Sequence, residues 1–274
     1  MKPFFTVIIP TLNEEKFLPK LLRDLTVQKE RDFEVIITDG YSKDKTKDCI
    51  KSFENGLKMN FFSTRLKNVA AQRNLGAEKA GGQYLVFLDA DARVGPTFLK
   101  KVRKNINKNK GLLFLPYLIP DREYRQYRTL FDLGNIFVEL SQSLPKRFSL
   151  GGAMIVERNF FRLIGGFDER LFISEDHELI QRAAAWGVHS KFVKEAKTSF
   201  SLRRMKKEGQ IKFFYKYFIA SARRLFLNEE IKNKIFEYEM GGQVYDESEK
   251  KKKEEFFNHY FNQIKGLLKK MLAD

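Results

Sequence analysis

Cysteine is almost absent from this chain, and long apolar runs are missing altogether. The single cysteine, Cys49, excludes a disulfide within the chain and a cysteine-based zinc site, as is typical of a reducing compartment. No run approaches the roughly 18 consecutive apolar residues of a membrane-spanning helix. The apolar run 4–9 is too short for a signal peptide. We therefore expect a cytoplasmic protein, soluble or lying peripherally on the inner face of the cell membrane.

Several sequence signatures are also missing. The chain has no internal repeat, helix-turn-helix pattern, zinc-finger spacing or RNA-binding aromatic signature. It does carry 51 Lys+Arg against 35 Asp+Glu, a formal charge of +16, which favours phosphates, nucleic acids or acidic membranes as partners. A nucleic-acid-binding protein is the remote alternative. No nucleic-acid partner is expected, because the acids that follow the predicted strands would repel a phosphate backbone.

The pattern along the chain predicts an α/β fold. A hydrophobic fraction of 43% with 27 Phe argues for a packed core. Up to about residue 118, strands and helices alternate, which is typical of parallel strands joined by helical crossovers. Expected strands cover 4–9, 34–38, 59–63, 84–88 and 154–156. Expected helices cover 17–25, 45–53, 69–80, 97–108, 124–144 and 175–186, the last ending at Gly187.

Polar side chains follow three of the predicted strands. Ligands of open parallel sheets bind beyond the carboxyl ends of the strands, where the loops of neighbouring strands converge. Acids at three such ends therefore predict one binding edge. Pro10, Thr11, Asn13 and Glu14 follow the first strand, Asp39, Gly40 and Ser42 the second, and Asp89 and Asp91 the fourth.

The triplet Asp89-Ala90-Asp91 is the most informative of these elements. Residues two apart on an extended chain project to the same side, so both carboxylates are expected to face one cation. Such oxygen ligands suit manganese or magnesium, with a bound diphosphate completing the coordination shell. The alternative is a loop that caps the helix beginning near Pro96.

Five segments together resemble the family 2 glycosyltransferases of the GT-A fold. They are VIIPTLNEE (7–15), EVIITDGYSKDKT (34–46), AAQRNLGAEKAGGQYLVFLDADARVGP (70–96), GGAMIVERNFFRLIGGFDE (151–169) and SEDHEL (174–179). The resemblance covers roughly the first 200 residues. It implies a Rossmann-like, mixed but mostly parallel sheet flanked by helices, and transfer of a sugar from a nucleotide-diphosphate donor.

The resemblance also implies roles for individual positions. Asp91 would bind a divalent metal, with Asp89 on the metal or the ribose and Asp39 on the base or ribose. Gly152 and Ala153 would form part of the acceptor wall. The remaining nucleotide-sugar contacts implied are Pro10, Thr11, Asn13, Glu14, Ser42, Arg73, Asn74 and Ala90.

A general base is needed because an acceptor hydroxyl is a poor nucleophile. Asp176 matches the family's base, with Glu175 beside it, and a base placed across the sugar from the diphosphate inverts the anomeric centre. The alternative is that both acids only stabilise a helix N-terminus through its dipole. We expect the catalytic role for Asp176, and we expect His177 to lie on the helix surface.

The chain departs from the family at one place. Many relatives have a metal-binding histidine after the Glu-Asp motif, but residues 198–204 contain none. Arg203 and Arg204 are candidates to bind the diphosphate instead, since a guanidinium matches phosphate oxygens. A solvated basic loop is the alternative.

The expected organisation is a catalytic domain at 1–205 and a basic helical extension at 206–274. The nucleotide-sugar half would cover about 1–118 and the acceptor half about 119–205. Basic and apolar residues between 201 and 224 form two faces of a predicted helix, which suits either an anionic membrane surface or packing on the catalytic domain.

The predicted function is therefore an inverting glycosyltransferase of cell-envelope glycan or glycolipid synthesis. UDP is the family's default nucleotide, and the acceptor would be a glycan or glycolipid. A GT-A-like protein that binds a nucleotide sugar without catalysis is the alternative.

Overall fold

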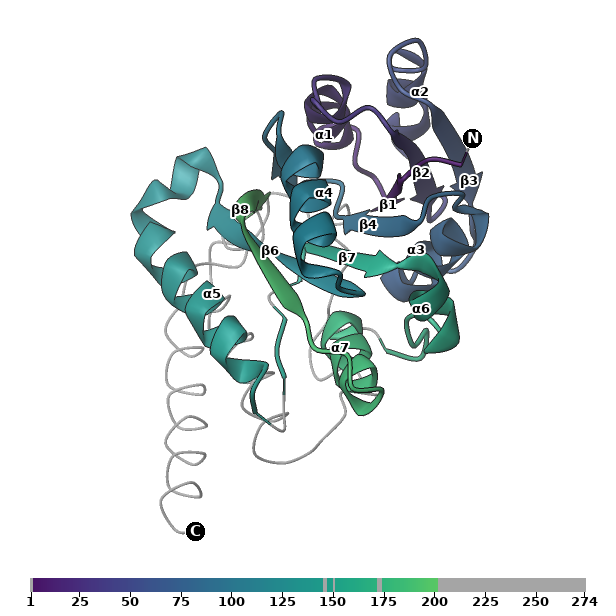
Figure 1. Ribbon diagram of the computed structural model, residues 1–274. Helices are drawn as coiled ribbons and strands as arrows, with labels where there is room; N and C mark the ends of the chain where they lie inside the picture. Colours follow the sequence, from purple (N-terminus) through teal and green to yellow (C-terminus); the bar gives the residue numbers. More distant parts are fainter. Residues whose placement is uncertain (1, 145–146, 150, 172–173, 202–274) are drawn as a thin grey trace, which may run out of the picture. The chain divides into compact units, whose positions relative to one another are not determined.

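The computed structural model, drawn in Figure 1, describes residues 2–144, 147–149, 151–171 and 174–201. Arg203, Arg204 and the predicted extension at 206–274 lie outside the described residues. The described residues form one eight-stranded sheet in the order β3-β2-β1-β4-β7-β6-β8-β5. This is the mixed, mostly parallel sheet that the sequence predicts.

The sheet has a parallel half and a mixed half. In the first half β3, β2, β1 and β4 are all parallel. In the second half β7 runs antiparallel to both β4 and β6, β8 is parallel to β6, and β5 is antiparallel to β8. The strands are β1 (Phe5–Thr11), β2 (Phe33–Asp39), β3 (Met59–Ser63), β4 (Tyr84–Leu88), β5 (Arg93–Val94), β6 (Leu113–Pro120), β7 (Ala153–Glu157) and β8 (Lys191–Phe200).

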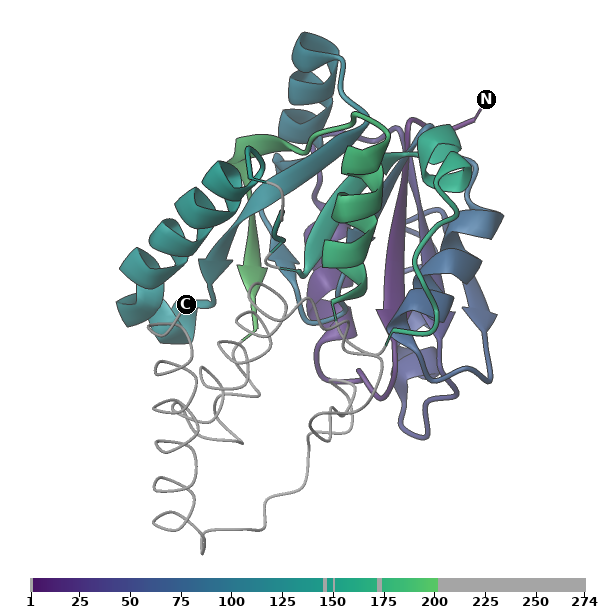
Figure 2. The ribbon, with the colours of Figure 1, turned by 90° about the horizontal axis from the view of Figure 1, so that it is seen from below.

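Helices cover both faces of the sheet (Figures 1 and 2). One hydrophobic core contains side chains of α1, α2 and α4, and the other contains side chains of α3, α5, α6 and α7. The helices are α1 (Leu18–Thr26), α2 (Thr46–Lys51), α3 (Val69–Lys79), α4 (Phe98–Asn109), α5 (Arg128–Ser141), α6 (Arg158–Leu163) and α7 (Glu175–Ala185), with a 3-10 helix η1 (Arg122–Tyr127) before α5.

The central strands are apolar along their whole length because both of their faces are covered. Every residue of β1, β2 and β4 is buried. In β1, Val7 and Ile9 enter one core and Ile8 enters the other, as expected of alternating side chains.

Helix α3 lies unusually close to β1 because a glycine faces the strand. A Cβ atom on Gly76 would lie 2.4 Å from the side chain of Ile8, which is fully buried. Arg73 and Asn74 are one turn earlier on this helix, so the contact at Gly76 fixes their height above the sheet.

Three parts of the second half differ from the sequence expectation. The helix expected over 124–144 is split into η1 and α5, with Tyr124 in a non-helical conformation. Strand β6 was missed, because Pro116 interrupts its pattern at a register shift. Strand β8, which includes residues 198–200, was not predicted from the sequence either. Gly187 does end α7, with a φ of +73°.

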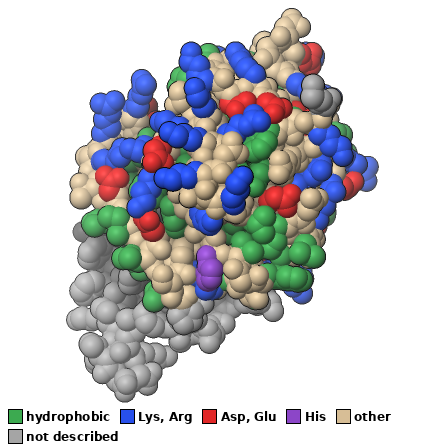
Figure 3. Space-filling model, in the orientation of Figure 1, with side chains coloured by type: hydrophobic (Ala, Val, Ile, Leu, Met, Phe, Trp, Pro, Cys, Tyr) green, Lys and Arg blue, Asp and Glu red, His purple; other side chains and the backbone are tan. Residues whose placement is uncertain are grey.

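On the face drawn in Figure 3, lysine and arginine side chains are spread over the surface with acidic side chains between them. In the part of the chain that the structure describes, no helix is long and apolar enough to cross a membrane.

Replacing Gly76 by alanine is expected to lower the free energy of unfolding by about 1–3 kcal/mol, because the new methyl group overpacks the contact with Ile8. The loss should appear although alanine is the better helix former by about 1 kcal/mol. Urea unfolding followed by circular dichroism measures it. Gly95→Ala is the control, since a Cβ there meets no atom within 4 Å. Equal midpoints for both variants would contradict the close packing of α3.

Candidate active site

The carboxyl ends of β1 and β2 are tied together by a buried aspartate. Thr11 lies opposite Asp39 in the parallel register, and its hydroxyl donates a hydrogen bond of 2.8 Å to Asp39 Oδ1. The hydroxyl of Ser42 also donates to this carboxylate, and so does its backbone N–H at 2.8 Å. Only 4% of Asp39 is exposed. In this structure the carboxylate therefore holds the two strand ends and the loop after β2 in place.

The loop after β1 is shaped by hydrogen bonds to the loop after β2. Asn13 has a positive φ of 54°, and its side-chain oxygen accepts a hydrogen bond from the backbone N–H of Lys43 at 2.8 Å. The backbone N–H of Glu14 donates to Thr46 Oγ1 at 2.7 Å. The predicted nucleotide-site residues Pro10, Thr11 and Glu14 are buried, while Asn13 and Ser42 are half-buried.

Arg73 on α3 is the electrostatic centre of the site. Its Nη2 lies 2.8 Å from Asp89 Oδ1 after β4, and its Nη1 lies 2.6 Å from Glu175 Oε1 at the start of α7. Its guanidinium also lies 5.4 Å from the centre of the Phe167 ring. Burial opposes the charge, but the neighbouring carboxylates outweigh it and raise the pKa of Arg73 above its ordinary value. One buried cation thus joins three separate elements.

The Asp89-Ala90-Asp91 triplet forms a turn, and the extended geometry expected for it is wrong. β4 ends at Leu88, and the turn is closed by a hydrogen bond from Ala92 N to Asp89 O at 3.0 Å. Ala90 is buried, and Asp91 is half-buried. Oδ1 of Asp89 pairs with Arg73, and the side chain of Asp89 is 35% exposed. The Asp89 carboxylate is therefore shared between an internal ion pair and the surface.

Asp89 and Asp91 are too few to hold a divalent cation alone, so such a site would need phosphate or water oxygens as further ligands. Among the described residues no three His, Cys, Asp or Glu side chains converge to hold a metal ion. Magnesium and manganese, however, are held by one or two carboxylates together with substrate phosphates and water. Asp89 and Asp91 lie two residues apart in the turn after β4, and both keep part of their surface exposed.

Glu175 and Asp176 open helix α7 and are both buried. For Glu175, burial and the adjacent Asp176 outweigh the attraction of Arg73, so its pKa is raised. For Asp176, burial raises the pKa, but His177, the hydroxyl of Ser149 and Arg73 favour the charged form more strongly and hold the pKa well below its usual range. Asp176 is the more strongly ionised of the two acids.

A small cavity of about 10 Å³ lies against Asp176. Its lining includes Arg73, Phe167 and the turn at Gly151 and Gly152, which have φ values of +70° and +77°. Asp176 Oδ2 is buried and has no hydrogen-bond partner among the described residues. A Cβ on Gly151 would lie 3.5 Å from this oxygen. The cavity holds about one oxygen-sized group beside an acceptor atom without a partner.

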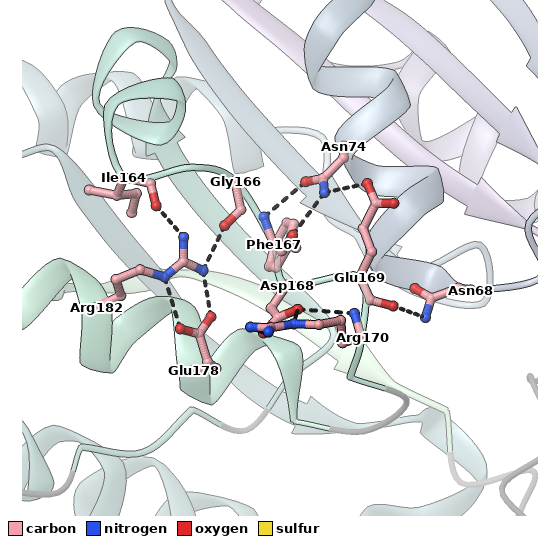
Figure 4. A network of polar contacts seen from close by, with 10 residues as sticks. All are labelled: Asn68, Asn74, Ile164, Gly166, Phe167, Asp168, Glu169, Arg170, Glu178 and Arg182. Atoms are coloured by element: carbon pink, nitrogen blue, oxygen red, sulfur yellow. Dashed lines mark hydrogen bonds and ion pairs between the residues drawn. The ribbon is translucent and has the colours of Figure 1, made fainter. Parts of the chain in front are cut away.

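The segment 164–171 joins the helices that carry Arg73 and Asp176 (Figure 4). Asn74 on α3 holds the backbone of Phe167 at both ends, accepting from its N–H at 2.9 Å and donating to its C=O at 2.8 Å, and also donates to the carboxylate of Glu169. Arg182 on α7 donates to the carbonyls of Ile164 and Gly166 and pairs with Glu178. The ring of Phe167 is thereby fixed against Arg73.

The structure brings most of the predicted site residues to one edge of the sheet and gives several of them internal partners. Asp39 and Asn74, which are predicted to contact the nucleotide, form hydrogen bonds with other residues of the protein. The sequence reasoning missed Gly151 and Phe167, although both belong to the glycine-rich segments it singled out. It also placed His177 on the helix surface, whereas His177 is half-buried and contacts Asp176. The roles of individual residues stay predictions.

Comparison with known families gives a match over more than half of the chain. The model of Glycosyl transferase family 2 matches residues 6–164. Validoxylamine A glucosyltransferase from Streptomyces hygroscopicus subsp. limoneus is 36% identical over 104 residues, which are 36% of this chain and 23% of the relative. Poly(ribitol-phosphate) beta-N-acetylglucosaminyltransferase TarS from Staphylococcus aureus is 30% identical over 115 residues, 40% of this chain and 20% of TarS. The chain thus matches about a quarter or less of these relatives' length.

Two kinds of solved structure share the fold. S. aureus TarS 1–349 in complex with UDP-GlcNAc aligns with a TM-score of 0.57 and 20% identity, covering 72% of this chain and 58% of that one. The mannosyltransferase PcManGT from Pyrobaculum calidifontis, in complex with GDP-Man and Mn2+, aligns with a TM-score of 0.61 and 19% identity, covering 80% and 65%.

Replacing Arg73 by glutamine is expected to lower the free energy of unfolding by about 3–5 kcal/mol, because it leaves the buried Glu175 carboxylate without its cation. The double variant R73Q/E175Q should recover part of this loss. Chemical unfolding at pH 7 measures both. Arg170→Gln is the control, since Arg170 is 81% exposed and its ion pair with Asp168 is worth less than about 1 kcal/mol. A loss in R73Q no larger than in R170Q would contradict the central role of Arg73.

Proposed function

Because the chain belongs to Glycosyl transferase family 2, we propose that it transfers a sugar from a nucleoside-diphosphate donor to an acceptor hydroxyl with inversion of the anomeric centre. The single observation that carries this proposal is Asp176, which lines an oxygen-sized cavity and whose buried Oδ2 makes no hydrogen bond among the described residues. An ionised carboxylate in this position is able to take a proton from a bound hydroxyl.

The reaction exchanges one bond for another. The acceptor oxygen attacks the anomeric carbon while its proton passes to Asp176, and the bond to the diphosphate breaks with both electrons leaving on the phosphate oxygen. Attack from the side opposite the leaving group inverts the carbon. Arg73 keeps Asp89 and Glu175 in place around this step through hydrogen bonds of 2.8 and 2.6 Å.

We propose that Asp91 and Asp89 hold a divalent cation, manganese or magnesium, together with the diphosphate. When bound, such a cation neutralises the charge that develops on the departing nucleotide. The two acids of the turn after β4 support this, and so does the Mn2+ in the structure of PcManGT. Arg203 and Arg204 are proposed to add positive charge to the diphosphate from beyond the described residues.

The donor and acceptor sides are proposed from the same comparison. We propose UDP as the nucleotide of the donor, as in the TarS complex with UDP-GlcNAc. Pro10, Thr11, Asn13, Glu14, Asp39, Ser42, Arg73, Asn74 and Ala90 would form or support its site, and Gly152 and Ala153 the acceptor wall. We propose 1–205 as the catalytic domain and a cell-envelope glycan or glycolipid as the acceptor. Contact of the basic region at 201–224 with an anionic membrane is a separate proposal.

Asp176→Asn should lower the rate of sugar transfer by about 10²- to 10⁴-fold, because the amide cannot take the acceptor's proton. A screen of nucleotide sugars, UDP-GlcNAc first, with product detection by mass spectrometry measures it. Asp48→Asn, at an exposed ion pair on α2, is the matched control and should keep full activity. If D176N transfers sugar at the unmodified rate, Asp176 is not the base. If both proteins bind the donor equally and neither transfers sugar, the protein is a binder without catalysis.

Asp91→Asn should remove the metal-dependent part of nucleotide binding, because a cation then loses a charged ligand. Thermal shift with UDP, with and without Mn²⁺, reports this directly, since binding to the native state raises the melting temperature. The unmodified chain and D48N should both gain more from UDP when Mn²⁺ is present. A D91N variant with the same Mn²⁺-dependent gain would refute the metal role of this residue.

A further inference from the structure

His177 is the residue after the proposed base, and its ring faces that base. His177 Nδ1 lies 3.2 Å from Asp176 Oδ1, and the side chain of His177 is only 16% exposed. An ionised carboxylate only accepts hydrogen bonds, so the contact requires a proton on Nδ1 of His177. Oδ1 of Asp176 is therefore hydrogen-bonded to a residue of the same helix.

The ring of His177 is held in turn by Phe148. The two ring centres are 5.6 Å apart and the rings are perpendicular. Phe148 is tied to the end of α5, where its N–H donates to Ser141 Oγ at 3.1 Å and its carbonyl accepts from Gln142 Nε2 at 2.9 Å. A side chain packed on an anchored ring keeps one orientation, which fixes Nδ1 on the carboxylate.

The second oxygen of Asp176 has a different environment. Oδ2 is buried, makes no hydrogen bond among the described residues and lies beside the turn at Gly151. The hydroxyl of Ser149, which lines the same cavity, also stabilises the charged carboxylate. The other charged groups nearby are Arg73 from α3, which pairs with Asp89 after β4, and Glu175 from the same helix. Asp89 and Glu175 each use an oxygen on Arg73, whereas Asp176 is the acid that lines the cavity.

We infer that His177 is the positioning residue of the base: its Nδ1–H holds Oδ1 of Asp176, which leaves Oδ2 as the atom that receives the acceptor's proton. This rests on the proposed function. The arrangement divides one carboxylate into an anchored oxygen and a reactive one. The histidine itself gains and loses no proton in the reaction.

Substitution of His177 tests the inference by kinetics. His177→Leu should lower kcat for transfer from UDP-GlcNAc, or from the donor found in the screen, by about ten- to a hundredfold, as for a misplaced catalytic group. KM for the donor should stay unchanged. His177→Asn, whose amide N–H replaces Nδ1–H, should recover most of the rate. His189→Leu, at the exposed histidine after α7, is the control and should behave as the unmodified chain.

The pH profile separates positioning from folding. In the unmodified chain, burial raises the pKa of Asp176, but His177, the hydroxyl of Ser149 and Arg73 together hold it low. Loss of the His177 contact raises that pKa, so the acid limb of kcat should move to higher pH in H177L and move less in H177N. A purely structural role would lower the melting temperature and leave the profile of the folded enzyme unchanged. An unchanged kcat and profile in H177L would overturn the inference.

A measurement without turnover keeps this test independent of the proposed function. In ¹⁵N NMR of the full chain, assigned with H177N, His177 should carry its proton on Nδ1 at neutral pH, and Asp176→Asn should change that signal. A proton on Nε2 alone would overturn the inference even if transfer is active. If no donor is used but Nδ1 is protonated and responds to D176N, the contact holds and the proposed reaction fails.

Discussion

The site depends on one buried guanidinium group, that of Arg73, which is surrounded by carboxylates. Arg73 is 7% exposed and pairs with Asp89 and Glu175, which belong to different elements. Neither a buried guanidinium nor a buried carboxylate is tolerable alone, because the lost hydration of each must be replaced by its partner. The two ion pairs therefore fix the positions of α3, the end of β4 and the start of α7 relative to one another. Gly76 allows α3 to lie close enough to the sheet for these pairs to form.

The antiparallel strand β7 explains why the proposed donor and acceptor sides meet. Leu88 at the end of β4 pairs with Ala153 at the beginning of β7, so the Asp89 turn lies beside Gly152, with a hydrogen bond of 3.3 Å from Asp89 N to Gly152 O. In a wholly parallel sheet the beginning of β7 would lie at the opposite edge. One reversed strand thus places the acidic turn and the glycine turn next to the proposed base.

Most polar side chains around the proposed base only hold the structure in place. Asn74 and Arg182 use their polar atoms on the backbone of 164–171, which fixes the Phe167 ring against Arg73. Asp176 differs from them, because its Oδ1 is held by His177 while its Oδ2 makes no hydrogen bond among the described residues. A rigid surround of this kind lowers the reorganisation that a proton transfer requires.

The sequence by itself determined the parallel half of the sheet, its helices and the edge at which the acids gather, because continuous apolar strands and amphipathic helices are local patterns. It also singled out Asp89, Asp176 and the glycine-rich segments. Strand β6, the turn at 89–91 and the half-buried position of His177 were decided only by the tertiary structure. Each of these depends on contacts between distant residues, such as Arg73 with Glu175 or His177 with Phe148, which no local pattern records. The local spacing of residues determines on which face of a helix or strand a side chain lies, whereas tertiary packing determines which residue it contacts.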